Sequence, residues 1–272
     1  GKGQHDEALS SYNKAIELKP DHFKAYNNRG NVLNSLGRYE EAINSFNKAI
    51  ELKPDYAEAY GNLGNTLNDF GLYEEATISY NKAIGLRSDY TEAYYNVAII
   101  FNTLGKYEEA ISNNKKALEL KPDFPEAHNN LGNTFRKLNR FDEAIASFSM
   151  AVEFKPDYAE AYNNLGIVFN DLGKYEEAIL KLNKAVEFKP DYAEAYNSLG
   201  IALDRLGQFE KAAFNYERAI GLKSGYVEAY SNFGDVLNNL GKYEEAIISY
   251  NKAIGLKPNI AEAYNNLGGV LS

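Results

Sequence analysis

The chain has 272 residues, a formal net charge of -9 at pH 7 and no cysteine. The negative charge argues against nucleic acid or an anionic membrane as a partner, because both attract basic surfaces. The absence of cysteine excludes disulfides and thiolate metal sites. No apolar run approaches the roughly 18 residues that a transmembrane helix needs, and no signal peptide begins at Gly1. We therefore expect a soluble protein, with the cytoplasm as the default compartment.

One segment of 34 residues recurs along the chain with small changes. Shifting the sequence by 34 residues places Tyr162 on Tyr196 and Ala178 on Ala212. Seven complete repeats follow one another without a gap, at 23–56, 57–90, 91–124, 125–158, 159–192, 193–226 and 227–260. A fixed period of this length indicates a solenoid, in which each repeat buries its apolar face against its neighbours.

Each repeat is predicted to form a pair of helices. In the repeat 159–192, apolar or small residues recur at helical spacing over Tyr162–Leu172 and again over Tyr175–Val186. Gly173 lies between the two segments, and the repeat that starts at residue 125 has Asn139 there. Glycine and asparagine both tolerate the left-handed backbone that ends many helices, so each repeat is predicted to be a helical hairpin.

The junctions between repeats predict capping boxes. Asp157 lies three residues before Glu160, and the same pair recurs at the other junctions. In a capping box, the two side chains accept hydrogen bonds from backbone N–H groups that the helix leaves unpaired. We therefore expect these carboxylates to cap the first helix of each repeat.

The recurring residues resemble those of a known family. Within 159–192, the matching positions are Tyr162, Leu165, Gly166, Phe169, Ala178, Leu182, Ala185 and Pro190. Their spacing is similar to that of the tetratricopeptide repeat (TPR), with tyrosine in place of the frequent tryptophan at the first of them. The resemblance covers the whole chain. It implies an all-α, right-handed superhelical solenoid in which the first helices line a concave groove and the second helices face outward.

The two ends are incomplete repeats. Residues 1–22 match only the second helix of a repeat, and residues 261–272 match only a first helix. We interpret 1–272 as one continuous array whose ends lack the polar caps usual for such arrays. This predicts head-to-tail self-association between molecules. The predicted contact joins Ala8, Leu9, Tyr12 and Ala15 of one molecule to Tyr264, Leu267 and Leu271 of the next.

No set of residues suggests catalysis, a metal site or a cofactor. The three histidines, His5, His22 and His128, lie at unrelated positions in different repeats, without ligand spacing. The glycines fall at hairpin turns and close helix crossings rather than in a phosphate-binding loop. We therefore expect a protein that is not an enzyme.

The candidate binding residues lie on the first helices. Their second, fifth, sixth, ninth, twelfth and thirteenth positions are predicted to face away from the apolar stripe. The sixth position is asparagine in all but one case: Asn28, Asn62, Asn96, Asn130, Asn164, Asn232 and Asn266, with Ser198 as the exception. A row of amides can pair with an extended peptide backbone, and it resembles the asparagine ladder in the superhelical arm of O-GlcNAc transferases. Alternatively, these amides hydrogen-bond within the array.

Selectivity has to come from positions that differ between repeats. At the ninth position Asn133 is polar, whereas Ile99, Ile167 and Ile201 are apolar. Tyr95 lies one helical turn from Ile99, and together they form a candidate apolar anchor.

Their repeat is also the most divergent, with Ala98 in place of glycine and Asn114 where other repeats have a larger side chain. Arg29 replaces an apolar residue, and the pattern offers no explanation for it.

The sequence therefore predicts a non-catalytic scaffold that binds an extended peptide segment of a partner protein in its concave groove. Two alternatives stay open: the recognition arm of a larger enzyme, and a structural solenoid that associates head-to-tail. Binding of chaperone tails is disfavoured because the lysines and arginine that it needs are replaced, for example by Asn129 and Asn163.

Overall fold

The structure is a computed structural model and describes residues 2–271, which form sixteen α-helices. In chain order the helices are α1 (Lys2–Leu18), α2 (Phe23–Ser35), α3 (Tyr39–Leu52), α4 (Ala57–Asp69), α5 (Tyr73–Leu86), α6 (Thr91–Thr103), α7 (Tyr107–Leu120), α8 (Pro125–Lys137), α9 (Phe141–Phe154), α10 (Ala159–Asp171), α11 (Tyr175–Phe188), α12 (Ala193–Arg205), α13 (Phe209–Leu222), α14 (Val227–Asn239), α15 (Tyr243–Leu256) and α16 (Ala261–Leu271). Even-numbered helices are the first helices of their repeats, and odd-numbered helices are the second. The all-α class and the helical hairpins predicted from the sequence are confirmed.

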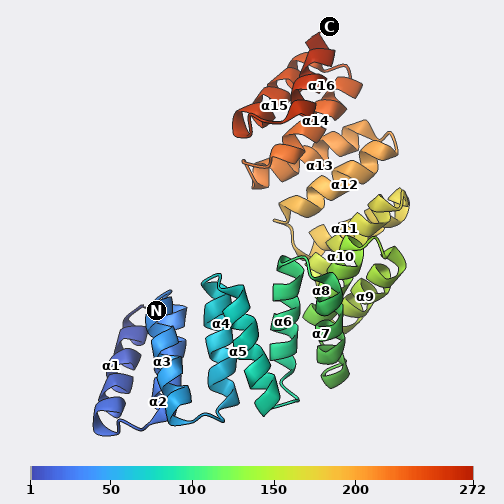
Figure 1. The fold of residues 1–272 in the computed structure, drawn as a ribbon. Helices are drawn as coiled ribbons and strands as arrows, with labels where there is room; N and C mark the ends of the chain where they lie inside the picture. Colours follow the sequence, from blue (N-terminus) through green and yellow to red (C-terminus); the bar gives the residue numbers. More distant parts are fainter. Residues whose placement is uncertain (1, 272) are drawn as a thin grey trace. The chain divides into compact units, whose positions relative to one another are not determined.

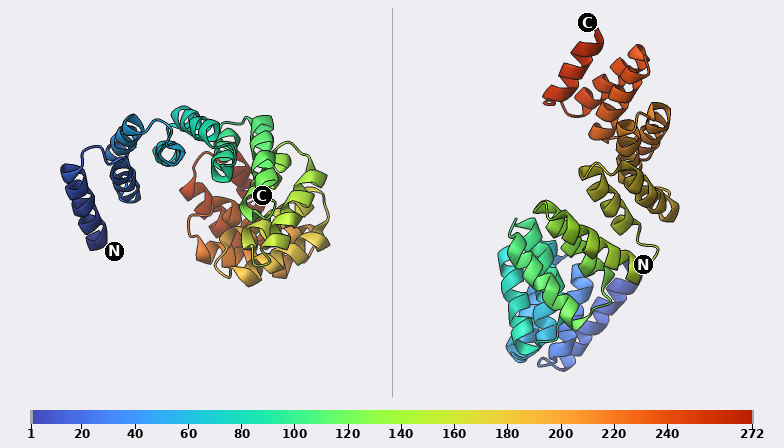
Figure 2. Two further views of the ribbon diagram at one scale, coloured as in Figure 1. Left: turned by 90° about the horizontal axis from the view of Figure 1, so that it is seen from below. Right: turned by 90° about the vertical axis from the view of Figure 1, so that its right-hand side faces the viewer.

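The chain divides into two compact units, residues 1–134 and 135–272, so the boundary falls within α8. The prediction that residues 1–272 form one continuous array stays a prediction. Within each unit, the two helices of a repeat pack as a hairpin, and each second helix also packs on the first helix of the next repeat. Figures 1 and 2 show this succession for α1 to α7 and for α12 to α16.

The first helices of neighbouring repeats contact one another directly. Such contacts join α2 to α4 and α4 to α6 in unit 1, and α10 to α12, α12 to α14 and α14 to α16 in unit 2. The first helices therefore form a continuous layer within each unit. This layer carries the candidate binding residues.

The hairpin turns have the backbone that the sequence predicts. Gly173 has φ 71° and Asn139 has φ 57°, both in the left-handed region. After α10, the Gly173 N–H donates to the Asn170 carbonyl at 3.0 Å, and the Lys174 N–H donates to the Phe169 carbonyl at 2.8 Å. These bonds satisfy carbonyl groups at the end of the helix and turn the chain into the second helix.

The capping-box prediction is wrong where the helix start can be examined. The residue that precedes α10 is Tyr158 rather than Asp157, and it makes no side-chain capping bond. The same holds for the tyrosines before α4, α6 and α12. The aspartate lies one residue too early to cap the helix. Glu160 instead accepts a hydrogen bond from the Lys189 ammonium, which follows the second helix of the same repeat, at 2.9 Å.

In the core of most hairpins, a small residue of the first helix packs against a large residue of the second. The eighth position of a first helix is usually glycine, which lies against a bulky side chain of the second helix. A Cβ atom added at Gly200 would lie 2.6 Å from the buried Tyr216 ring. Ala98 breaks this rule, and the residue opposite is the smaller Asn114, which is fully buried. The divergence of the repeat 91–124 is therefore a coupled change in core packing.

Candidate functional site

The sixth-position asparagines form hydrogen bonds between neighbouring repeats. The Asn62 amide donates to Asn27 Oδ1 at 3.0 Å, and the Asn232 amide donates to Asn197 Oδ1 at 3.2 Å. The other two such bonds end on ninth-position side chains: Asn96 donates to Asn65 at 3.0 Å, and Asn266 donates to Asp235 at 2.8 Å. These bonds correspond to the alternative in which the amides pair within the array.

Asn130 belongs to a larger polar network in unit 1. Its amide donates to Asn114 Oδ1 at 3.2 Å, and its own Oδ1 accepts from Asn102 at 2.9 Å. The Thr134 hydroxyl lies 2.9 Å from Asn102 Oδ1. The network links α6, α7 and α8, so Asn130 fixes the packing of two successive repeats.

The remaining sixth-position amides differ in exposure. Asn28 is exposed and accepts a 3.4 Å hydrogen bond from Asn27, whereas Asn164 is half-buried. A primary amide has two N–H donors and a carbonyl with two lone pairs. One bond to a neighbouring repeat therefore leaves capacity for a second partner.

Three of the fifth-position asparagines are buried rather than groove-facing as the sequence predicts. Asn27, Asn163 and Asn197 expose 0%, 3% and 4% of their surface. The contact between successive first helices covers these side chains, and Asn27 and Asn197 accept the inter-repeat bonds of the sixth-position amides. Periodicity within one helix could not reveal this, because the covering atoms belong to the next repeat.

A hollow of about 580 Å³ lies on the first-helix layer of unit 2. Its walls are Asn163, Ile167, Asn170, Asn197, Ser198 and Ile201 from α10 and α12, Tyr192 and Tyr226 from the junctions, and a charged rim that includes Arg136, Asp171, Glu194, Arg205 and Glu228. Two of the three predicted isoleucines, Ile167 and Ile201, therefore share one site. We call this hollow the α10–α12 groove.

Two amide oxygens at the α10–α12 groove lack a hydrogen bond. Oδ1 of Asn163 and Oδ1 of Asn170 are buried and have no partner in the described structure. The amino group of Asn170 donates to the Ser198 carbonyl at 3.0 Å, and that of Asn163 makes a weak 3.4 Å contact with the Tyr192 hydroxyl. A buried acceptor without a donor costs free energy, so these amides gain from a ligand that supplies N–H groups.

Much of the charge at the rim is already paired. Arg136 Nε lies 2.9 Å from Asp171 Oδ2, and Lys223 Nζ lies 2.6 Å from Glu194 Oε1. The hydrogen bond from Lys223 lowers the pKa of Glu194 despite partial burial. Burial raises the pKa of Tyr192 and of Tyr226 to about 12, so both phenols are neutral at pH 7. The groove offers aliphatic contact and hydrogen-bonding groups rather than a reactive acid or base.

The predicted anchor in unit 1 is partly covered. The Tyr95 ring packs on Phe124 with a centroid distance of 4.9 Å, and burial raises its pKa. Ile99 and Asn133 are half-buried. Tyr95 therefore contributes to packing next to the repeat junction, and both residues of the predicted anchor are half-buried.

The residues predicted for head-to-tail contact fall into two classes. Leu9 is 9% exposed and packs with Leu33 and Phe46, and Leu267 packs against Leu237 and Tyr250. These two leucines already belong to the cores of their own units. The others are more accessible: Ala8, Tyr12 and Ala15 are half-buried, while Tyr264 is 51% and Leu271 66% exposed.

Residues 2–271 contain no cluster of three or more histidine or acidic side chains placed to hold a metal ion. The His128 ring lies 2.9 Å from the Pro122 carbonyl, at a junction between repeats. None of the helices in the described part of the chain combines the length and apolarity required to span a bilayer.

Family profiles match the sequence repeatedly. The profile described as "TPR repeat" matches residues 2–34, 30–71, 99–135, 132–172, 168–207 and 234–271, and profiles described as "Tetratricopeptide repeat" match 57–90 and 193–225. No curated protein matches the chain.

Solved structures with the same fold include proteins of several kinds. YrrB, described as a TPR protein with an unusual peptide-binding site, is 28% identical and has a TM-score of 0.58; the alignment covers 69% of this chain and 96% of YrrB. MamA is 30% identical with a TM-score of 0.54, covering 60% of this chain and 95% of MamA.

A chain of the Cut9–Hcn1 hetero-tetramer has a TM-score of 0.74 at 18% identity, which shows the fold alone. In that comparison the alignment covers 98% of this chain and 53% of the other. The recurring hairpins and the profile matches together show that the chain belongs to the tetratricopeptide repeat family, whose members serve as protein-interaction scaffolds.

Proposed function

We propose that this chain is a non-catalytic scaffold that binds an extended peptide segment of a partner protein in the α10–α12 groove. The observation that carries the proposal is the composition of that groove, where aliphatic side chains and under-bonded amides line one hollow. A peptide supplies both kinds of partner, since it alternates side chains with backbone N–H and C=O groups.

The geometry suggests which parts of a peptide contact which residues. An aliphatic side chain packs between Ile167 and Ile201, which occupy the same position in successive repeats. Backbone N–H groups donate to Asn163 and Asn170 after their amides rotate toward the ligand. The amides recognise the peptide backbone, and the two isoleucines recognise one peptide side chain. This small set of contacts gives a modest affinity, on the order of micromolar.

The similarity to YrrB supports the proposal. YrrB is described as having a peptide-binding site, and its alignment covers 69% of this chain at 28% identity. The inter-repeat bonds of the sixth-position amides modify the asparagine ladder: an amide that joins two repeats has only its remaining donor or acceptor for a ligand. Ligand contacts therefore concentrate at the α10–α12 groove instead of being spread over every repeat.

The test is a peptide-display selection followed by affinity measurement on groove variants. Ile167→Ala and Ile201→Ala should each weaken the selected peptide at least about tenfold, because a buried aliphatic anchor is lost. Leu180→Ala is the matched control, since Leu180 is 67% exposed on the second helix α11 and lies outside the groove. Circular dichroism and melting curves establish that each variant is folded.

Selection of no peptide, or equal affinity for the wild type and both isoleucine variants, would contradict the proposal. The recognition arm of a larger enzyme and the head-to-tail solenoid stay hypotheses. Sedimentation of wild type and Tyr264→Ala at high concentration tests the second of them: self-association that depends on Tyr264 supports it, and a monomer in both cases argues against it.

A further inference from the structure

Grooves also lie on the opposite layer, between successive second helices. Three such grooves are equivalent by repeat position. One lies between α1 and α3 with α2 as its floor, one between α11 and α13 over α12, and one between α13 and α15 over α14, with volumes of about 540, 660 and 640 Å³. We call them the α2, α12 and α14 grooves.

The α2 groove differs from the other two in polarity. At the seventh position of the repeat, the floor residue is Leu199 in the α12 groove and Phe233 in the α14 groove, but Arg29 in the α2 groove. The wall changes with the floor. At the twenty-second position, Phe214 and Ile248 flank the apolar grooves, whereas Ser10 and Asn44 flank Arg29. Because polar side chains replace apolar ones on both the floor and the walls, the α2 groove is suited to a polar ligand, and Arg29 is not an isolated substitution.

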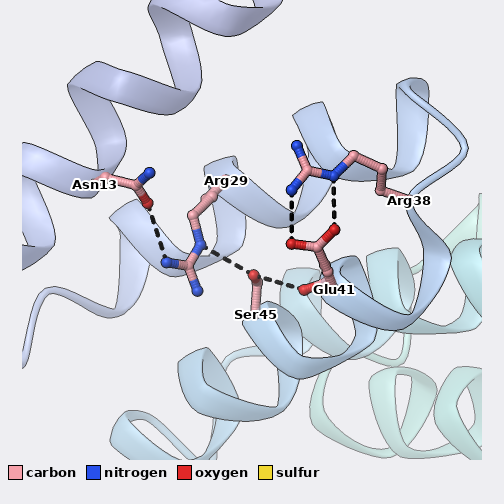
Figure 3. A network of polar contacts seen from close by, with 5 residues as sticks. All are labelled: Asn13, Arg29, Arg38, Glu41 and Ser45. Carbon is pink, nitrogen blue, oxygen red and sulfur yellow. Dashed lines mark hydrogen bonds and ion pairs between the residues drawn. The ribbon is translucent and has the colours of Figure 1, made fainter.

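The Arg29 guanidinium is held in a defined orientation. Its Nε donates to Ser45 Oγ at 3.1 Å, and Nη1 donates to Asn13 Oδ1 at 3.2 Å (Figure 3). Ser45 is fixed in turn, because its hydroxyl donates to the Glu41 carbonyl at 2.9 Å. The guanidinium also lies 5.2 Å from the centroid of the Tyr26 ring. Neutral groups therefore position this cation from three sides.

No carboxylate among the described residues lies within ion-pair distance of Arg29. The nearest candidate, Glu41, is occupied by Arg38, which donates two parallel hydrogen bonds to it, each 2.7 Å long (Figure 3). The hydrogen bond from Arg38 lowers the pKa of Glu41, with a smaller contribution from the charge of Arg29. A guanidinium has five N–H donors, and the two bonds of Arg29 leave three for a ligand.

The charges of the groove favour a ligand with a single negative charge. Arg38 and Glu41 neutralise each other, and Asp6 at the rim offsets part of the charge of Arg29. A dianion would meet stronger repulsion from Asp6, while a monoanionic carboxylate matches the fork of the guanidinium.

We propose that the α2 groove binds a carboxylate group through Arg29, with the flanking side chains of Ser10 and Asn44 available to hydrogen-bond to the attached group. The carboxylate belongs to a protein partner and is either its C-terminal group or the side chain of an acidic residue. This site lies on the second-helix side of unit 1, and it is independent of the proposed peptide groove on α10 and α12.

The test is a titration followed by NMR at the arginine Nε–H groups. The probes are N-acetylglycine, which represents a C-terminal carboxylate, and N-acetylglutamic acid α-amide, which represents a side-chain carboxylate. N-acetylglycinamide is the uncharged control, and inorganic phosphate tests for a dianion. We expect saturable chemical-shift changes at Arg29 with at least one carboxylate probe. The probe that binds more tightly shows whether the natural ligand is a C-terminal or a side-chain carboxylate.

The decisive variant is Arg29→Leu, which introduces the residue found at this position in the repeats 57–90, 125–158, 159–192 and 193–226 and should therefore fold. It should weaken carboxylate binding, measured by calorimetry, by about tenfold or more, because a charge-assisted hydrogen-bond pair is lost. Arg218→Leu removes an exposed arginine 5.7 Å from the centroid of Tyr196 and should leave binding unchanged. Equal binding by wild type and Arg29→Leu, no binding of either carboxylate, or binding of phosphate alone would each overturn the proposal.

Discussion

Asp235 and Asn65 occupy the same position in two repeats and accept the same hydrogen bonds. Oδ1 of Asp235 accepts from the Tyr250 hydroxyl at 2.7 Å and from the Asn266 amide at 2.8 Å. Oδ1 of Asn65 accepts from Tyr80 at 2.7 Å and from Asn96 at 3.0 Å. The geometry is shared, but only one of the two accepting side chains, the carboxylate of Asp235, is ionisable.

This pair leads to a prediction about pH. Burial raises the pKa of Asp235 above its ordinary value of 3.8, although the hydrogen bonds from Tyr250 and Asn266 oppose the rise. The folded state then binds the proton more tightly than the unfolded state, so this group lowers stability as the pH rises from 3.8 through the raised pKa. Asp235→Asn should remove that loss while keeping both hydrogen bonds.

Urea denaturation between pH 3.5 and 7 checks the prediction, with Asn65→Asp as the reverse variant. The difference in unfolding free energy between Asp235→Asn and wild type should grow toward pH 7 in favour of the variant. A constant difference across that range, or one that shrinks as the pH rises, would show that Asp235 does not carry a raised pKa.

At the scale of single residues, the sequence predicts correctly where the backbone conformation alone determines which residue type is found. Gly173 and Asn139 are recognisable because few residue types adopt a positive φ, and both do so. The capping box fails because the helix starts one residue later than the Asp–Glu spacing suggests, with Tyr158 as the residue before it. Arg29 could be recognised as unusual, but its partners Asn13 and Ser45 lie sixteen residues away on either side and emerge only from the fold.

At the scale of the helical hairpin, the contact between the eighth position and the bulky residue opposite it leads to a second prediction. Gly200→Ala places a Cβ 2.6 Å from the Tyr216 ring, which is 1% exposed and cannot move outward. We expect a loss of about 1–3 kcal/mol in unfolding free energy from overpacking. Gly207→Ala tests backbone strain rather than steric crowding. Gly207 has φ 70°, and no atom lies within 4 Å of a Cβ added there.

The coupled pair Ala98 and Asn114 gives a third prediction, tested by a double-mutant cycle. Asn114→Tyr should destabilise the protein, since the larger ring meets the Cβ of Ala98 and the bond from Asn130 is lost. Ala98→Gly in the same chain should recover part of the loss, because it recreates the glycine and tyrosine pair of the repeat 57–90. Additive effects of the two substitutions would mean that the two residues are not coupled.

Ion pairs between exposed side chains should matter much less than these core contacts. Lys189 and Glu160 lie at opposite ends of one repeat and pair at 2.9 Å, but their side chains are 42% and 44% exposed. Lys189→Met should therefore change the unfolding free energy by less than about 1 kcal/mol, a result to be read from thermal melts at low and high salt. A larger loss that disappears in high salt would show that this pair contributes strongly to the stability of its repeat.

At the scale of the whole molecule, the period of 34 residues predicts the helical hairpins, their order and the packing of each repeat on the next. The candidate site is predicted only in outline. Repetition identifies Ile167 and Ile201 as equivalent, and the structure brings them to one groove. It does not predict that Asn27, Asn163 and Asn197 at the fifth position are buried, or that several sixth-position amides bond to the preceding repeat, because both facts depend on atoms of a second helix pair.

The central claim is that a partner peptide binds the first-helix layer at the α10–α12 groove. The most direct measurement is photo-cross-linking with benzoylphenylalanine placed at Arg205, an exposed residue on the rim of that groove, and separately at Leu180 on α11. With the peptide obtained by selection, cross-linking should occur from position 205 and not from position 180. Cross-linking from position 180 alone, or with equal yield from both positions, would contradict the account.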